Sequence, residues 1–217
     1  MMGLNIDVIR ENLPLFLEGL GVTMLISVVA IPAAIMLGAI VALCRLSSLK
    51  ILRTGALCYL EILRNVPFMI QVFLIYYLLP FYGFRFPAYV VGIIGLSIYA
   101  SSYFSEIIRA AILSLPTGQL ESARSMGMSK LQAMIHIVLP QLPPYIVPPF
   151  INQSSTLIKD TAILSTITVQ ELTMATQRVQ QESYDFVEPL VFAAALYLAI
   201  NTIMIFTMSK IKQAKST

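Results

Sequence analysis

The sequence predicts an all-α membrane protein whose chain crosses the bilayer in five helices. Of its 217 residues, 58% are hydrophobic and only 12% are charged, and the mean hydropathy is +0.82. An ordinary soluble domain is less apolar than this. The apolar residues also gather in long runs, each sufficient for the roughly 20 residues that a membrane-spanning helix needs. The net charge of +3 is small, so composition gives no support to a nucleic-acid-binding protein.

The five spans are expected at about residues 16–44, 54–80, 86–115, 141–166 and 187–209, within one domain that covers residues 1–217. The first is the clearest, because the 26 residues from Gly19 to Cys44 carry no charge. The second is expected to be one helix that includes Glu61 and Arg64. The third is rich in small residues, which allow helices to pack closely in lipid.

The fourth span has an unusual composition, with four prolines between residues 143 and 149 and polar residues between 152 and 160. Proline leaves backbone carbonyls without donors, so this segment is not expected to face lipid and should line an interior. Residues 171–188 are polar and are expected to form a loop or short helix outside the membrane.

The distribution of Lys and Arg predicts the orientation. With the N-terminus outside and the C-terminus inside, the inner segments hold nine of these residues and the outer segments three. The nine are Arg45, Lys50, Arg53, Arg109, Arg124, Lys130, Lys210, Lys212 and Lys215, and the three are Arg10, Arg85 and Arg178.

A polar stretch at residues 117–138, which we call the docking segment, interrupts the apolar pattern on the inner side. Pro116 ends the preceding span, Gly127 fits the position just past a helix end, and Ser129 with Gln132 has the spacing of a capping box. Ala123 and Gly127 give a face of small groups that a partner protein can approach closely. The alternative is an amphipathic helix on the membrane surface, which needs large apolar residues opposite a basic face.

The run Glu-Ser-Ala-Arg-Ser-Met-Gly-Met-Ser-Lys at residues 121–130, followed by Leu-Pro-Gln at 139–141, resembles the cytoplasmic EAA loop of ABC importer permeases. It is most similar to the group that carries polar amino acids. Ser122 departs from that pattern, in which alanine is usual, and it is small enough for docking to survive. The resemblance extends to Tyr59, Glu61, Arg64, Pro67, Tyr103, Glu106, Arg109, Pro116, Gly118, Gln119, Asn152, Gln153, Lys159, Asp160, Thr161, Glu171 and Leu172.

The resemblance implies a type I ABC importer permease fold in the bacterial inner membrane. It implies that two such permeases, identical or related, form the pathway, with an extracytoplasmic solute-binding protein outside. A dimer of ATP-binding cassette subunits would bind ATP and Mg²⁺, so the chain itself would need no cofactor and would not be an enzyme. The residues that this dimer would grip are Glu121, Ser122, Ala123, Gly127 and Ser129.

Candidate pathway residues lie in the fourth span. Asn152, Gln153 and Thr156, with Lys159 and Asp160, offer groups for the carboxylate and ammonium of a zwitterionic amino acid, since broken helices near mid-membrane commonly expose polar groups. A network that only packs helices together is the alternative.

Two further pairs of charged residues have helical spacing. Glu61 with Arg64, and Glu106 with Arg109, are each three residues apart, which suits a structural ion pair on one helix or a gate between two permeases.

No arrangement of residues supports catalysis. There is no Ser/His/Asp or Cys/His grouping and no glycine-rich phosphate loop, and the single His136 lacks a second metal ligand at useful spacing. An ion-coupled secondary transporter is one rival function, although it would usually show internal repeats. A non-transporting membrane scaffold is the other, but it leaves the polar fourth span unexplained.

Overall fold

The computed structural model describes residues 6–214, apart from the side chains of Thr117 and of residues 208–214. Of the C-terminal lysines, Lys215 lies outside the described residues, and Lys210 and Lys212 are described by their backbone alone. Every regular element in the described range is helical, as the sequence predicts.

Three helices are each long and apolar enough to cross a membrane: α2 (Leu13–Arg45), α5 (Ala88–Ser114) and α10 (Val187–Ala214). Two further spans are present if each of two bent helix pairs is counted as one. The shorter helices α1 (Ile6–Glu11) and α9 (Leu172–Ser183) flank the ends of α2 and α10.

The first bent pair corrects the expectation of one continuous helix at 54–80. Helix α3 (Lys50–Asn65) is followed by α4 (Phe68–Leu78) and the short η1 (Leu79–Tyr82), and the two parts meet at 102°. Val66 is extended at the break, with φ −98° and ψ 128°. Pro67 causes this, because it lacks an amide hydrogen and disfavours helix in the residue before it.

The second bent pair contains the proline-rich segment. Helix α8 (Pro143–Asp160) continues into η4 (Thr161–Ile167), and this part meets the preceding segment, residues 130–141, at 67°. The bend falls next to Pro143, whereas Pro148 and Pro149 lie inside α8, which continues through them. The expected disruption is therefore concentrated at the start of the helix.

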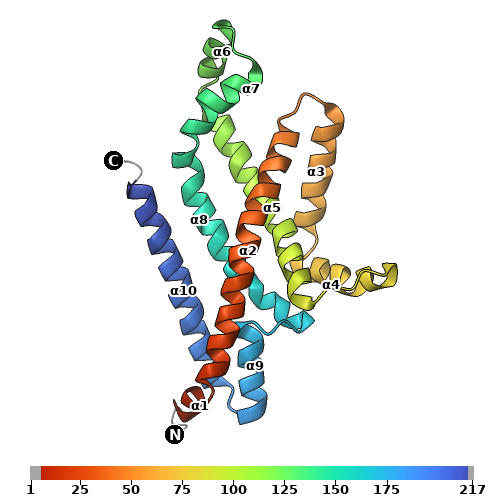
Figure 1. Cartoon of the computed structure of the whole chain (residues 1–217), viewed down its shortest axis with the longest axis vertical. Coiled ribbons are helices and arrows are strands. Elements are labelled where there is room, and N and C mark those ends of the chain that lie inside the picture. Colours follow the sequence, from red (N-terminus) through yellow and green to blue (C-terminus); the bar gives the residue numbers. More distant parts are fainter. Residues whose placement is uncertain (1–5, 215–217) are drawn as a thin grey trace.

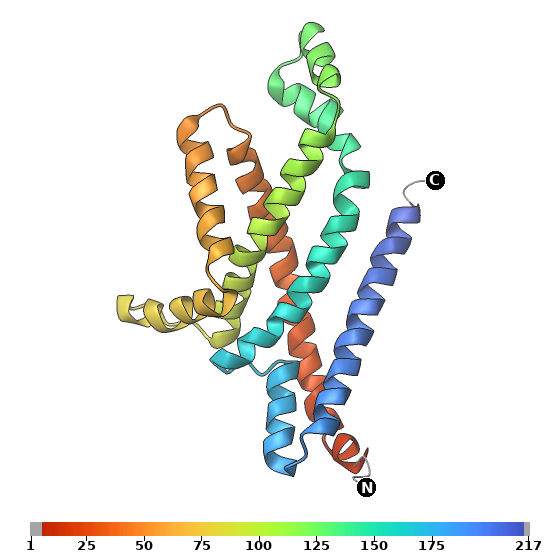
Figure 2. The same ribbon diagram turned by 180° about the vertical axis from the view of Figure 1, so that it is seen from behind.

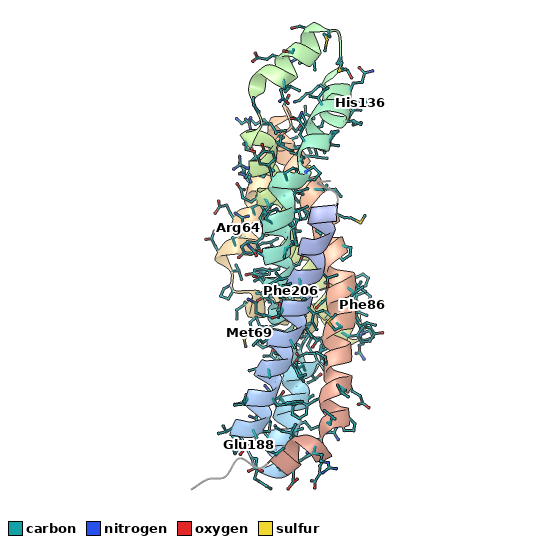
Figure 3. The ribbon with its side chains drawn as sticks, turned by 90° about the vertical axis from the view of Figure 1, so that its left-hand side faces the viewer. Arg64, Met69, Phe86, His136, Glu188 and Phe206 are labelled. Atoms are coloured by element: carbon teal, nitrogen blue, oxygen red, sulfur yellow. The ribbon has the colours of Figure 1, made fainter. Side chains whose placement is uncertain are left out.

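The elements form an elongated bundle (Figures 1 and 2). The α2–α3 connection and the docking segment lie at one end, toward which α10 also runs, while α1 and α9 lie at the opposite end. Seen edge-on, the molecule is narrow, with His136 near one end and Glu188 near the other (Figure 3).

Helices α2 and α5 form the centre of the bundle and are in close contact with each other. A Cβ atom added at Gly38 of α2 would lie 2.8 Å from the Cβ of Phe104, 2.9 Å from the Ser105 nitrogen and 3.0 Å from the Ser101 oxygen, all on α5. Ala30 and Ala34 are fully buried on the same face of α2. Small residues therefore bring the two backbones together, as dispersion packing in lipid requires.

The outward faces of the bundle are apolar. Along α10, large side chains such as Leu198 and Ile203 are more than three-fifths exposed in the single chain. Such a surface is stable against lipid tails or against a second membrane subunit.

Gly38→Ala is expected to lower the free energy of unfolding of the purified protein by about 1–3 kcal/mol, because the added methyl has only backbone and a Cβ to displace. Thermal unfolding in detergent measures this. Gly21→Ala on the same helix is the matched control, since nothing lies within 4 Å of its added Cβ. It should be neutral or stabilise by about 0.5–1 kcal/mol; equal effects of the two variants would contradict the close α2–α5 contact.

Candidate functional site: the docking segment and a polar helix face

The docking segment folds as two short helices with a turn between them. Helix α6 (Thr117–Ser125) ends where the Met126 amide donates to the Ser122 oxygen at 3.1 Å and the Gly127 amide to the Arg124 oxygen at 3.0 Å. Gly127 has φ +87°, a conformation that glycine adopts without a Cβ penalty. The prediction that it stands just past a helix end is confirmed.

The second helix starts at a capping box, also as predicted. The Gln132 amide donates to the Ser129 hydroxyl at 3.2 Å, and the Ser129 amide donates to the Gln132 side-chain oxygen at 2.9 Å. This helix, α7 (Lys130–Ala133), continues through a π-helical turn, η2 (Met134–Val138), into η3 (Leu139–Gln141). The turn between α6 and α7 is therefore fixed on both sides by its own hydrogen bonds.

The exposed surface of the docking segment differs from the expected one at one position. Glu121, Ser122 and Gly127 are exposed, and so is Ser129. Ala123, in contrast, is only 2% exposed, because α6 packs on α7 and η2. Ala123 thus lets the two halves of the segment lie close together, and its side chain does not face a partner in this conformation.

A hollow of about 320 Å³ opens beside the turn, lined by Met126, Gly127, Met128, Gln132 and His136. The Nδ1 atom of His136 is 2.9 Å from the backbone carbonyl oxygen of Gln132. Met126 is 74% exposed, so a large apolar side chain stands next to the hollow without cover from this chain. An exposed apolar group beside a concave surface is suited to contact with another protein.

The docking segment is anchored to two long helices. Val138 of η2 and Leu142 form a buried cluster with Ala111 of α5, against which Leu120 of α6 packs. The Gln141 side chain also donates to the Gln119 side chain at 2.7 Å. A displacement of the docking segment therefore moves the ends of α5 and α8 with it.

The five candidate pathway residues are brought to one side of α8. Asn152, Thr156 and Lys159 are exposed and follow one another at helical spacing, and Gln153 and Asp160 are half-buried beside them. The opposite side of the helix, with Ser154 and Ile158, is buried, and at the edge of the polar face Ser155 donates to the Asn201 side chain of α10 at 2.6 Å. One helix thus carries a packed face and an open polar face.

Arg64, expected to pair with Glu61, lies instead against α5. Its guanidinium donates to the Ser102 oxygen at 2.6 Å and stands 5.3 Å above the ring of Tyr103. Glu61 accepts from the Asn65 side chain at 2.9 Å, and the structure gives no Glu61–Arg64 ion pair within the described residues. A separation of three residues was insufficient to predict an ion pair between Glu61 and Arg64, because groups on α5 compete for the guanidinium.

The second expected pair is present and is part of a larger group. Glu106 binds Arg109 through one carboxylate oxygen, with the Arg109 Nε at 3.2 Å. Its other oxygen binds the guanidinium of Arg45, which the sequence analysis counted only as an inner-side charge. Arg45 is in the last turn of α2, so this ion-pair triad joins α2 to α5.

Glu171 was missed by the sequence analysis, which assigned it to a polar segment outside the membrane. Its side chain is fully buried and accepts from the Met174 amide at 2.8 Å, the Thr173 amide at 3.0 Å and the Tyr197 hydroxyl at 2.9 Å. It thereby caps α9 and ties it to α10. Burial raises the pKa of this carboxyl, although the hydrogen bonds act in the opposite direction.

Comparison with known proteins gives consistent results. Residues 34–215 match the family described as binding-protein-dependent transport system inner membrane component. The chain is 34% identical to a probable glutamine ABC transporter permease protein, GlnM, of Bacillus subtilis over 91% of this chain and 92% of that protein. It is 33% identical to a putative glutamine transport system permease protein, GlnP, of Rickettsia bellii over 87% of each.

Solved structures share the fold. A crystal structure of an amino acid ABC transporter with histidines matches with a TM-score of 0.90 and 32% identity, covering 98% of this chain and 100% of that one. The MetNI methionine ABC transporter in an inward-facing conformation matches with a TM-score of 0.80 over 92% of this chain and 95% of that one. Its 20% identity supports a likeness of fold alone.

Glu171→Gln is expected to change how stability depends on pH. The pKa of Glu171 is raised on folding, so above about pH 4.3 the unfolded chain releases a proton that the folded protein still holds. Wild-type stability therefore falls as pH rises from the pKa of the unfolded chain to that of the folded protein. The side chain of the variant cannot ionise, so the Tm of the variant minus that of the wild type should increase as pH increases. Thermal unfolding at several pH values checks this; a Tm difference independent of pH would contradict it. Glu11→Gln, at an exposed carboxylate, is the control.

Proposed function

Because this chain belongs to the family of binding-protein-dependent transport system inner membrane components, we propose that two such subunits form the pathway of an ATP-driven importer of polar amino acids. The chain is a membrane permease subunit and not an enzyme, and ATP is hydrolysed by a separate subunit. One observation carries the proposal: an exposed helical turn with Gly127 at its tip is anchored to α5 and α8 at one end of an apolar bundle.

We propose the topology that the charge count predicts, with five spans, the N-terminus outside and the C-terminus inside, in one domain. The arrangement supports it, since the α2–α3 connection, flanked by Arg45 and Lys50, and the docking segment, with Arg124 and Lys130, lie at the same end of the bundle (Figure 1). The bent pair at residues 50–82 then counts as one span, and of the second bent pair only the part at residues 143–167 crosses the membrane, since residues 130–138 belong to the docking segment. The end that carries α1 and α9 is the one on which the solute-binding protein would act.

The partner that we propose for the docking segment is a dimer of ATP-binding cassette subunits, which holds ATP and Mg²⁺. Glu121, Ser122, Gly127 and Ser129 are exposed for this contact, and Ala123 supports the turn from within. Closure of the ATPase dimer would shift the docking segment and, through the cluster at Ala111, the helices attached to it.

The polar face of α8 supports a second permease subunit, identical or related. Lys159 and its polar neighbours are exposed in the single chain, and such groups are costly against lipid. A second subunit facing α8 would enclose them in a pathway. There, Lys159 and Asp160 would meet the carboxylate and ammonium of the amino acid, with Asn152, Gln153 and Thr156 along the same route.

The test is uptake of labelled polar amino acids by the complex of permease, ATP-binding subunits and binding protein in proteoliposomes. Uptake that requires ATP and no ion gradient is expected, and uptake by the permease alone or driven by an ion gradient would contradict the proposal. Gly127→Leu should lower uptake per ATP hydrolysed by roughly tenfold or more, the equivalent of about 1.4 kcal/mol. Gly83→Leu is the matched control, since it shares a positive φ and open surroundings but lies outside the docking segment.

Asp160→Ala is expected to raise the KM for uptake by about tenfold if the carboxylate contacts the ammonium group of the substrate, since one lost charged contact is worth about 1.5–3 kcal/mol. Lys159→Ala should raise the KM to a similar extent, because it removes the contact with the carboxylate of the substrate. Kinetics of labelled uptake at equal amounts of folded protein measure this. Arg53→Ala, at an exposed residue of α3, is the control and should leave the KM unchanged. A loss explained by protein amount alone would favour a packing role.

A further inference from the structure

Arg45 joins the two central helices at the end of the bundle that carries the docking segment. It stands in the last turn of α2, and its guanidinium binds the Glu106 carboxylate on α5, which also binds Arg109. The Arg45 side chain is only 14% exposed, against 33% for Glu106 and 28% for Arg109. Partial burial reduces screening by solvent, so this triad is a firmer link than an exposed surface pair.

Arg45 continues the face of α2 that contacts α5. Gly38, Ala42 and Arg45 are spaced by four and three residues and share one side of the helix. Ala42 is fully buried, and the backbone at Gly38 is in direct contact with α5. A sliding motion between α2 and α5 would therefore have to break both the small-residue contact and the triad.

The far end of α2 contacts α9 in the same way. A Cβ added at Gly19 would lie 2.8 Å from the Cβ of Ala175 and 3.0 Å from the Cα of Leu172. The Leu172 amide also donates to the Thr23 hydroxyl at 3.2 Å. One continuous 33-residue helix is thus fixed to α5 near the docking segment and to α9 at the opposite end of the bundle (Figure 2).

Helix α5 is the element that leads directly into the docking segment. It ends at Ser114, and α6 begins at Thr117 after only two residues. A displacement of the docking segment therefore acts on α5, as it does on α8, which begins at Pro143 directly after the segment. Helix α8 continues through η4 toward α9, and the link between α5 and α2 gives the displacement a second route to α9.

We propose that Arg45 is a positioning residue that fixes α2 to α5, so that α2 transmits displacement of the docking segment to α9 at the opposite end of the bundle. This inference rests on the proposed function, because it assigns to α2 the transmission of movement between the two ends of an ATP-driven importer. Arg45 touches neither nucleotide nor solute in this role. It determines how much of the movement at one end passes along α2 to the other end.

The test is the ratio of amino-acid uptake to ATP hydrolysis in the reconstituted complex. Arg45→Gln is expected to lower this ratio by about tenfold or more, while ATP hydrolysis persists, because docking is intact and only transmission is lost. Arg53→Gln, at an exposed residue of α3 near the same end, is the control and should leave the ratio unchanged. The double variant Arg45→Glu with Glu106→Arg restores an opposite-charge pair and should recover much of the ratio.

Three results would overturn the inference. An unchanged ratio for Arg45→Gln would remove any role in transmission. A fall in Tm and in the amount of assembled complex, with a normal ratio per assembled complex, would make Arg45 structural only. Failure of the charge exchange to raise the ratio above that of Arg45→Gln, with the complex assembled, would exclude the ion pair as the link. If the wild-type complex shows no ATP-dependent uptake, the proposed function itself fails, which is a separate outcome.

Discussion

The contact between the backbones of α2 and α5 is the constraint on which the rest of the structure depends. It forms where Gly38 leaves no side chain between the helices, and Ala30 and Ala34 extend it toward the other end. In lipid, where apolar side chains gain little from leaving their solvent, such close packing is what holds helices together. Because α5 leads into the docking segment and α2 reaches α9, this pair connects the two ends of the bundle.

Polar groups around this helix pair are of two kinds: some are paired between helices, and others lie on a surface that this chain leaves uncovered. Ser155 and Asn201 satisfy each other between α8 and α10 and so act as packing contacts. The adjoining face of α8, with Lys159 and Asp160, is open in the single chain. An open polar face amid apolar helices is unstable against lipid, so it is explained best by a facing subunit and a water-filled route between the two.

Much of the fold could be predicted from the sequence, because hydropathy and local capping signals are short-range properties. The apolar runs located the long helices, and Gly127 and Ser129 located the turn of the docking segment. The bend before Pro67 had a local signal too, but the continuous apolar run concealed it. Residues whose partners lie on other helices could not be assigned: spacing within a helix gave no reason for Arg64 to bind α5, for Arg45 to reach Glu106, or for Glu171 to be buried against Tyr197.

The central claim is that the docking segment faces the inside and is gripped there by an ATP-binding subunit. The most direct measurement introduces Ser122→Cys into a variant without Cys44 and Cys58 and labels it with a membrane-impermeant maleimide in vesicles of known sidedness. The account predicts labelling only from the cytoplasmic side in vesicles stripped of the ATP-binding subunits, and protection when those subunits are bound. Labelling from the outside, or equal labelling with and without the ATP-binding subunits, would contradict it.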